Sequence, residues 1–111
     1  MSFRETRLAE NESFFRRINE RLEELEPESA TSLVVLCECA DPDCAQRLTI
    51  LHTEYDAVRA DGTQFVVAHG HGDPEIESVV SRTDRFEVVR KRGIAGAVAE
   101  QLDPSGELQP G

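Results

Sequence analysis

The chain has 111 residues, the length of one small domain. Its 22 acidic and 12 basic side chains give a formal net charge of −10, which argues against nucleic-acid binding because that requires clustered Lys and Arg. The first residues are charged where a secretion signal would be apolar, and no stretch approaches the roughly 20 apolar residues of a membrane span. We therefore expect a cytoplasmic protein with reduced cysteines and no membrane partner.

The charges are unevenly placed along the chain. Residues 31–81 hold nine acidic and two basic side chains, so this central part is strongly acidic. One basic cluster follows it, made of Arg82, Arg85, Arg90, Lys91 and Arg92. We interpret this cluster as the solvated face of a strand rather than as a binding patch.

The N-terminal region predicts an amphipathic helix over about residues 3–26, ending before Pro27. Its apolar residues recur at steps of seven, three, four and three: Leu8, Phe15, Ile18, Leu22 and Leu25. The same stripe fits the a and d positions of about three heptads, so a homodimer through helix 3–26 is an alternative. We favour a helix lying on the chain's own sheet, because Phe14 widens the apolar stripe.

After a linker at 27–32, the pattern predicts short strands and one short helix. The strands lie at 33–36, 47–52 and 65–68, and the helix at 54–60. Residues 73–82 fit either a helix or a strand, and we favour one helical turn followed by a strand that pairs with 86–91. The first two strands flank a turn and form an antiparallel hairpin.

These elements predict an α+β fold. The N-terminal amphipathic helix packs on a small, mainly antiparallel sheet over 33–92, with a zinc knuckle at a hairpin tip. Residues 1–92 form a single domain. Residues 93–111 are rich in Gly, Ala, Pro and Ser and read as a flexible C-terminal tail, within which 94–102 is a candidate short helix.

The stretch "LCECADPDC" carries three cysteines with the spacing C-x-C-x4-C. Alternate residues of an extended segment point to the same face, so Cys37 and Cys39 lie together, and the Asp-Pro-Asp turn brings Cys44 back towards them. A disulfide between the first two would have to span about 6.6 Å, at the limit of bridgeable distances, and would leave an unpaired thiol. Burial as small apolar side chains explains one cysteine but not three within eight residues. A metal site explains all three.

A structural zinc ion is tetrahedral, so three thiolates need a fourth ligand. Our first candidate is His71, which lies between two glycines in the loop after a strand, where the backbone can approach a metal closely. His69 is the second candidate and His52 the third. The predicted ligands are thus Cys37, Cys39, Cys44 and His71 around zinc, with an iron–sulfur cluster as the alternative. Such a zinc ion would contribute on the order of 10 kcal/mol, comparable to the whole stability of a small domain.

The cysteine spacing resembles that of the post-SET zinc motif, whose fourth ligand comes from elsewhere in the chain. A longer pattern resembles a group of small actinobacterial proteins: the helix "ENESFFRRINERLEEL", Cys-Glu-Cys followed by a third cysteine, Gly70-His71, and "VVRK" at 88–91. This likeness covers about residues 8–91. It implies that His71 is the functional histidine, and it implies no catalytic residues.

The chain lacks the zinc deaminase pattern, a P-loop and a G-x-S-x-G motif. We therefore expect a structural-zinc protein that acts as a protein-interaction or regulatory module and not as an enzyme. Its partner would be a protein that binds the N-terminal helix or the acidic face around Asp41, Asp43, Glu54 and Asp56. One alternative is a switch that loses zinc when its thiolates are oxidised. Another is an enzyme with an open zinc position, in which Glu38 or Glu54 supplies acid–base chemistry.

Overall fold

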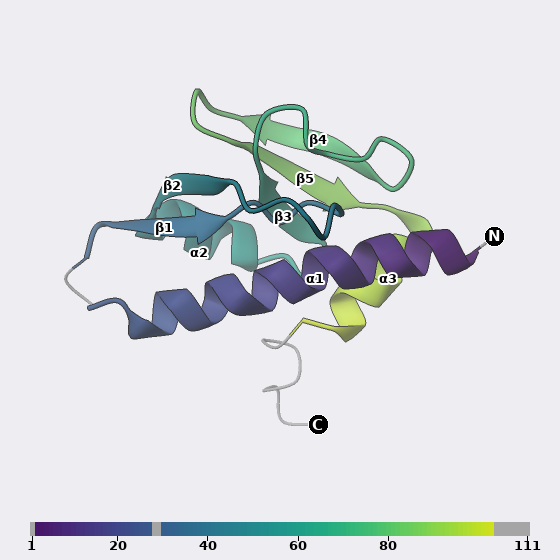
Figure 1. The fold of residues 1–111 in the computed structure, drawn as a ribbon, viewed down its shortest axis with the longest axis horizontal. Helices are drawn as coiled ribbons and strands as arrows, with labels where there is room; N and C mark the ends of the chain where they lie inside the picture. The colour runs from purple at the N-terminus through teal and green to yellow at the C-terminus, as the bar shows by residue number, and fades with distance from the viewer. Residues whose placement is uncertain (1, 28–29, 104–111) are drawn as a thin grey trace.

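The computed structural model describes residues 2–27 and 30–103, and within these the chain forms three helices and five strands (Figure 1). The elements are α1 (Ser2–Leu25), β1 (Ser32–Leu36), β2 (Arg47–Leu51), α2 (His52–Arg59), β3 (Gln64–Val67), β4 (Glu77–Arg82), β5 (Glu87–Lys91) and α3 (Gly93–Gln101). The predicted α+β fold is confirmed. None of these described helices combines the length and the apolar character that crossing a membrane would require.

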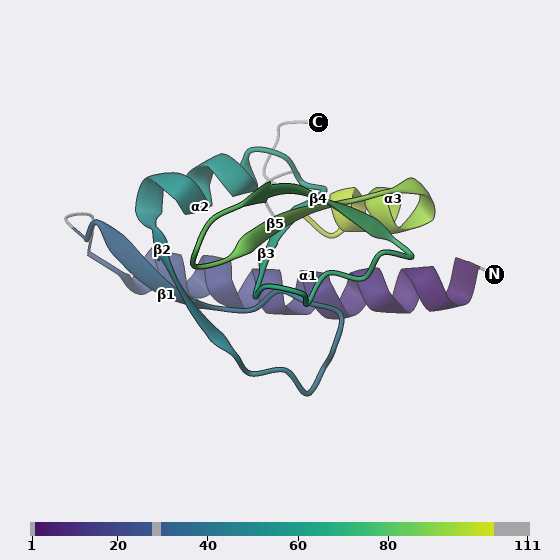
Figure 2. The same cartoon turned by 90° about the horizontal axis from the view of Figure 1, so that it is seen from above.

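The strands form two antiparallel sheets rather than one. β1 pairs with β2 in the first, and the second has the order β3-β5-β4. The sheets meet just after β1, where the Glu38 N–H donates to the carbonyl oxygen of Val66 at 2.8 Å. Figures 1 and 2 show α1 running along both sheets. In Figure 2, α2 and α3 lie on one side of α1 and the loop between β1 and β2 extends on the other. One apolar core unites β1, β2, α2, β3, β5 and α3.

β1 alternates between core and solvent, although its sequence from Leu33 to Leu36 is a continuous apolar run. Leu33 and Val35 are buried and face the equally buried Ile50 and Leu48 of β2. Val34, between them, is 56% exposed. The reason is that the β1–β2 pair covers the core with one face only, so every second side chain points outward.

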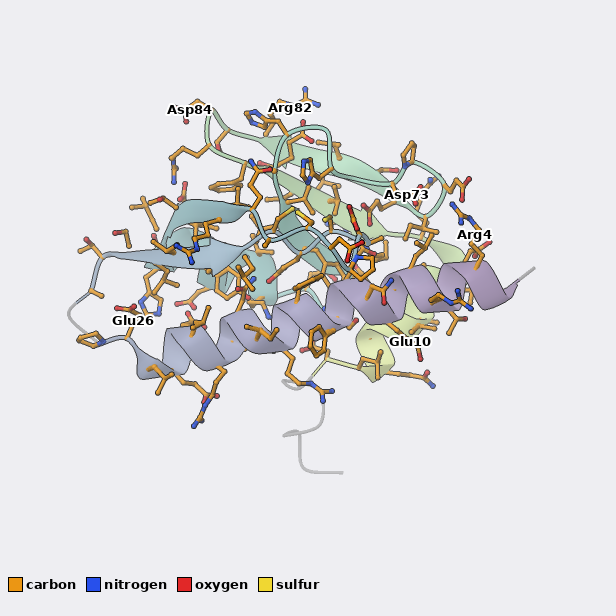
Figure 3. The ribbon with its side chains drawn as sticks, in the orientation of Figure 1. Arg4, Glu10, Glu26, Asp73, Arg82 and Asp84 are labelled. Carbon is orange, nitrogen blue, oxygen red and sulfur yellow. The ribbon has the colours of Figure 1, made fainter. Side chains whose placement is uncertain are left out.

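Residues 73–82 form one turn and then a strand, as predicted. The Glu77 N–H donates to the carbonyl oxygen of Asp73 at 3.1 Å, and β4 then pairs with β5. The ladder is irregular between Val79 and Ser81. Arg82 and Asp84 project at the outer end of this hairpin (Figure 3).

α1 packs on the sheets, but with a different face from the one its apolar stripe predicted. Of that stripe only Phe15 is buried, while Leu22 is 37% and Leu25 68% exposed. The neighbouring Phe14 is 61% exposed. The buried residues of α1 are instead mostly polar: Ala9, Glu12, Ser13, Phe15, Arg16 and Asn19. The polar side chains can be buried because partners elsewhere in the fold satisfy them.

The most deeply buried of these partners is Lys91 of β5. Its ammonium group contacts Glu12 of α1 at 2.5 Å and also Glu77 of β4, and all three side chains are almost completely buried. Lys91 was expected on a solvated face with its basic neighbours, and this expectation was wrong. Burial lowers the pKa of Lys91, an effect opposed by Glu12, and the Lys91 ammonium lies 4.4 Å from the Phe65 ring centroid. Aromatic contact and the two carboxylates compensate for lost hydration.

Two arginines tie α1 to the rest of the fold in the same way. Arg16 donates to the carbonyl oxygens of Gly62 (2.6 Å) and Ala99 (2.8 Å). Arg59 of α2 bridges Glu20 of α1 (2.7 Å) and Asp103 after α3 (2.5 Å).

The predicted short helix at 94–102 is present as α3, and it packs against α1 and β5. Small side chains allow the close approach: Ala95 and Ala99 are fully buried, and a Cβ on Gly96 would lie 3.2 Å from the Lys91 carbonyl oxygen. The packed part of the chain therefore reaches Asp103, and the domain boundary suggested at residue 92 falls inside this packing. The rest of the predicted tail, 104–111, lies outside the described residues.

Replacing Lys91 should destabilise the protein strongly. We expect Lys91→Met to cost about 3–5 kcal/mol of unfolding free energy, because it leaves two buried carboxylates without their cation. The control is Arg90→Met, whose exposed guanidinium pairs with Asp61 at 3.5 Å and should contribute less than about 1 kcal/mol. Urea unfolding measures both, and equal losses would contradict a special role for the buried cation.

Candidate metal centre

The first two cysteines lie on an extended segment that continues β1. The Cys37 N–H donates to the carbonyl oxygen of Gln46, the residue before β2, at 2.8 Å. The next residue, Glu38, donates its N–H to Val66 of β3. Because side chains alternate along an extended segment, Cys37 and Cys39 share one face while Glu38 points to the other. Both cysteines are buried, at 0% and 2% exposure.

A tight turn returns the third cysteine to the first two. The Cys44 N–H donates to the Asp41 carbonyl oxygen at 3.1 Å, and the Asp43 N–H donates to Asp41 Oδ1 at 2.9 Å. Pro42 fits this turn because its ring fixes φ. Cys44 is half-buried, at the tip of the β1–β2 connection, which Figure 2 shows as a wide loop.

The histidine comes from the loop after β3. The His71 N–H donates to the Ala68 carbonyl oxygen at 3.0 Å, closing a turn in which Gly70 has a φ of +78°. Residues with a Cβ rarely adopt this left-handed conformation, so glycine is what allows the tight reversal. The turn places His71 Nδ1 3.5 Å from Cys37 Sγ and 3.6 Å from Cys44 Sγ.

The structure thus brings together the four predicted residues, Cys37, Cys39, Cys44 and His71, with one ligand atom of each within 4.8 Å of all the others. All three cysteines are free thiols. With zinc–sulfur bonds of about 2.3 Å and zinc–nitrogen bonds of about 2.0–2.1 Å, a tetrahedral ion separates sulfur from nitrogen by about 3.6 Å. The two measured sulfur–nitrogen distances match that value.

One sulfur accepts a backbone hydrogen bond, because the Ala68 N–H donates to Cys37 Sγ at 3.2 Å. The backbone of Asp41 lowers the pKa of Cys39, and the backbone of Gln46 opposes the rise in the pKa of Cys44. Hydrogen bonds to a thiolate lower its energy and spread its negative charge. The surrounding backbone therefore favours the thiolate form of these cysteines.

The thiols perturb one another strongly. Hydrogen bonding from Cys37 lowers the pKa of Cys39 to about 5, helped by His71 and the Asp41 backbone and opposed by burial. The pKa of Cys37 is raised by that same contact with Cys39 and by burial. Burial also raises the pKa of Cys44. One thiolate therefore forms readily, and a bound cation would displace the protons of the other two.

Glu38, between the two buried cysteines, holds the segment from its opposite face. Its carboxylate accepts hydrogen bonds from Asn19 Nδ2 (2.9 Å), the Tyr55 hydroxyl (2.9 Å) and the Val66 N–H (3.0 Å). Complete burial raises the pKa of Glu38, an effect that these donors oppose. The Glu38 carboxylate thus fixes the segment to α1, α2 and β3. Its oxygens are taken up by these three donors, on the side of the segment away from the sulfurs.

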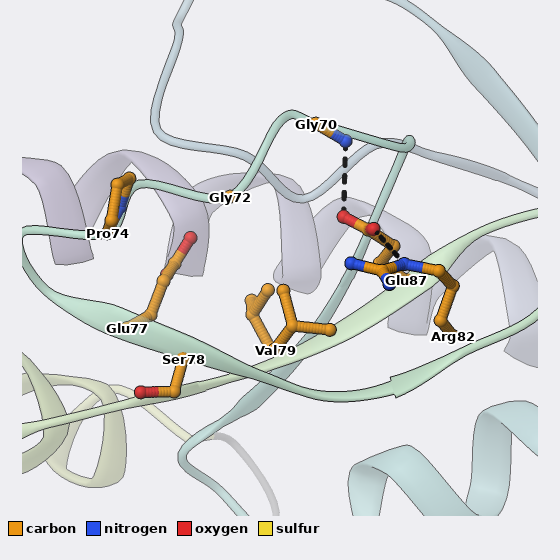
Figure 4. Close-up of a pocket in the computed structure, with 9 residues that line it drawn as sticks. Gly70, Gly72, Pro74, Glu77, Ser78, Val79, Arg82 and Glu87 are labelled. Carbon is orange, nitrogen blue, oxygen red and sulfur yellow. Dashed lines mark hydrogen bonds and ion pairs between the residues drawn. The ribbon is translucent and has the colours of Figure 1, made fainter.

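A second carboxylate supports the histidine loop. Glu87 of β5 accepts the Gly70 N–H at 3.1 Å and pairs with Arg82 of β4 at 2.5 Å (Figure 4). The Arg82 guanidinium lowers the pKa of Glu87, which keeps the acceptor ionised. Beside this contact, the loop and β4 border a cavity of about 350 Å³ lined in part by Gly72 and Val79.

The other two histidines lie elsewhere. His69 Nε2 is 2.6 Å from the Thr83 carbonyl oxygen, so it ties the loop to the β4–β5 hairpin. His52 begins α2 and lies 2.8 Å from Glu23 of α1. Of the three candidates for the fourth ligand, the structure brings only His71 to the cysteines.

Sequence reasoning missed the groups that support the site. Backbone donors leave no trace in residue identity, and neither Asn19 nor Glu87 stands near a cysteine in sequence. Glu38 carried a visible signal, because an acid between two ligand cysteines points into the core, but we considered it only for catalysis. The other catalytic candidate, Glu54, pairs instead with Arg85 at 2.9 Å and accepts the Leu51 N–H.

Comparison of the chain with protein-family models, with curated proteins and with solved structures gives no match. The resemblance to small actinobacterial proteins therefore stays a prediction, and the site has to be interpreted from its own geometry.

The turn at Gly70 offers a test of how the histidine is positioned. A Cβ there would meet nothing within 4 Å, so Gly70→Ala adds strain without a clash. The left-handed conformation costs a residue with a Cβ about 1–2 kcal/mol, so we expect roughly tenfold weaker zinc binding. Gly70→Asn should lose less, because asparagine tolerates this conformation. Competition with a chelator measures both, and equal or absent losses would contradict the role given to the turn.

Proposed function

We propose that this protein is a small zinc-binding protein in which Cys37, Cys39, Cys44 and His71 hold a structural Zn²⁺ ion. The observation that carries the proposal is the match between the sulfur–nitrogen distances of 3.5 and 3.6 Å and the edge of a zinc tetrahedron. An ion with three thiolates and a neutral imidazole has a net charge of −1, which the Ala68 N–H that donates to Cys37 Sγ partly offsets. Reduced free cysteines suit a reducing compartment such as the cytoplasm.

A structural role fits this ligand set better than catalysis. Four protein ligands complete a tetrahedron, whereas a catalytic zinc keeps one position for water or substrate. The two carboxylates considered for acid–base chemistry, Glu38 and Glu54, are both engaged in other contacts. A redox switch would need accessible sulfurs, but Cys37 and Cys39 are buried and only Cys44 is partly exposed. An iron–sulfur cluster distributes its ligands over two or more irons, and ligand atoms within 4.8 Å of one another suit a single ion.

Metal analysis of protein purified without added metal tests the zinc site. We expect one tightly held equivalent of zinc, lost in Cys39→Ser and in His71→Ala together with a large drop in unfolding temperature, because the ion supplies on the order of 10 kcal/mol. His69→Ala is the matched control and should keep the ion. Protein that folds equally well after chelation, or that retains tight zinc without His71, would refute the proposal.

We propose further that the zinc-stabilised fold is an interaction module and that its contact surface is on α1. The α1 stripe consists of Phe14, Ile18, Leu22 and Leu25, which follow one another at steps of four, four and three along one side of the helix. Two of these side chains are more than 60% exposed. Apolar side chains that align on an exposed helix face are a typical site of association with another helix.

Charge placement favours a second copy of this chain as the occupant. Arg17 and Glu24 are exposed on one flank of the α1 stripe, seven residues apart. In an antiparallel pair of helices, the same flank of each copy faces the other. Setting Phe14 against Leu25 of the second copy brings Arg17 close to Glu24 of that copy, twice by symmetry. Arg17 and Glu24, which also pairs with Arg21 of its own helix at 3.1 Å, thus give this flank charges that complement the same flank of a second copy.

Sedimentation at rising protein concentration tests the dimer. Wild type should pass from monomer to dimer between micromolar and millimolar concentration, and Leu25→Glu should remain monomeric because it places a carboxylate in the apolar contact. Val80→Glu, at an exposed position of β4, is the control and should dimerise as wild type does. A wild type that stays monomeric throughout, or Leu25→Glu that dimerises normally, would contradict a self-association role for the stripe.

A further inference from the structure

A second group of metal-ligating side chains lies outside the cysteine cluster, where the end of α1 meets the start of α2. Glu23, His52 and Asp56 each offer one ligand atom, and these atoms lie within 4.8 Å of one another. His52 and Asp56 are four residues apart on α2, so they share one face of that helix. Glu23 approaches from the last turns of α1.

The distances suit a first-row divalent ion with nitrogen and oxygen ligands. His52 Nε2 lies 2.8 Å from Glu23 Oε2 and 4.0 Å from Asp56 Oδ1. Around a tetrahedral zinc ion, nitrogen and oxygen ligands are about 3.3 Å apart. One of the two distances is shorter than this value and the other is longer. Small rotations of the side chains would bring both nitrogen–oxygen distances to the value expected around zinc. The backbone of His52 is already fixed, because its N–H donates to the Thr31 carbonyl oxygen at 2.9 Å.

An ion pair between a protonated His52 and one carboxylate accounts for only part of this arrangement. Glu23 Oε2 is buried, and its near contact is His52 Nε2 at 2.8 Å, which leaves Asp56 outside the pair. Glu23 and Asp56 each place a carboxylate oxygen within 4.8 Å of the other, and two adjacent carboxyl groups need a proton or a cation between them. A divalent cation would satisfy both carboxylates and the imidazole at once.

The cluster also has an open side. His52 and Asp56 line a surface cavity of about 480 Å³ together with Ala30, Thr31 and Thr53. A metal held by three protein ligands keeps a position for water or another small ligand, and such a position needs space in front of it. The cavity supplies that space.

We propose that Glu23, His52 and Asp56 form a second, exchangeable Zn²⁺ site with a water ligand facing this cavity. The site is weaker than the thiolate centre, because Asp56 is exposed and no sulfur takes part. The bound ion would connect α1 to α2, which are separated in the sequence by the linker and the β1–β2 hairpin. The proposal does not rest on the thiolate site, since the two groups share no ligand.

Equilibrium dialysis against Zn²⁺ and titration with Co²⁺ test the second site. We expect wild type to bind two equivalents, of which only the tighter gives the sulfur-to-cobalt charge-transfer absorption. His52→Ala and Asp56→Asn should keep that absorption and weaken the second equivalent by more than about 100-fold, beyond what loss of a supporting group costs. His69→Ala is the matched control for casual binding by an exposed histidine and should keep both equivalents.

The outcomes separate the two metal sites. Wild type that binds only the thiolate-linked equivalent, or His52→Ala that keeps the second at unchanged affinity, would overturn the proposal. Absence of the charge-transfer absorption with a His52-dependent equivalent still present would instead overturn the zinc centre proposed above. Asp56→Asn changes a mostly exposed side chain, so circular dichroism should confirm that it folds and that its binding result can be read directly.

Discussion

The alternation of side chains at Cys37, Glu38 and Cys39 is the constraint on which most of this fold depends. An extended segment must send the two sulfurs one way and the carboxylate the other. The sulfurs face the loop that carries His71, and the carboxylate enters the core, where α1, α2 and β3 each supply a donor. A short peptide thereby joins four parts of the chain that are remote in sequence. One face of this segment therefore carries the sulfurs of the cysteine–histidine cluster, and the other carries the carboxylate that ties it to the helices.

The interior of this small protein is unusually rich in charge. Glu12, Arg16, Glu38, Arg59 and Lys91 are all buried and all bound by specific partners. Buried ion pairs add little net stability compared with apolar packing, but they penalise any arrangement that separates the partners. A metal ion that contributes strongly to the free energy of folding would permit such a core. The buried ion pairs then need only select the correct arrangement and need not supply much stability themselves. The polar face of α1 packs inward because only this arrangement of the helices and sheets brings its buried side chains to their hydrogen-bond and ion-pair partners.

The sequence was sufficient for the element order and for the hairpin that carries the cysteines, because period-two patterns, turn residues and cysteine spacing are local signals. His71 lies 27 residues beyond Cys44 and was chosen for its place between two glycines in the loop after a strand. The sequence was insufficient for α1. The stripe at Leu22 and Leu25 looks like a core face, yet the residues that face the core are Glu12, Arg16 and Asn19 at helical spacing. Nothing local distinguishes a solvated Glu12 from one that meets Lys91 across 79 positions of sequence. The packing of α3 was equally hard to predict, because its small residues stabilise the fold only through their close contact with β5.

The burial of Lys91 has a consequence for the protein's surface chemistry. Lys91 is the only lysine in the sequence, and its ammonium group is inaccessible to solvent. The folded protein therefore presents no side-chain amine to acetylation, to ubiquitin ligation or to amine-directed cross-linkers. Regulation of such a chain by lysine modification would require it to unfold first. Conversely, any reagent captured by Lys91 reports that the core has opened.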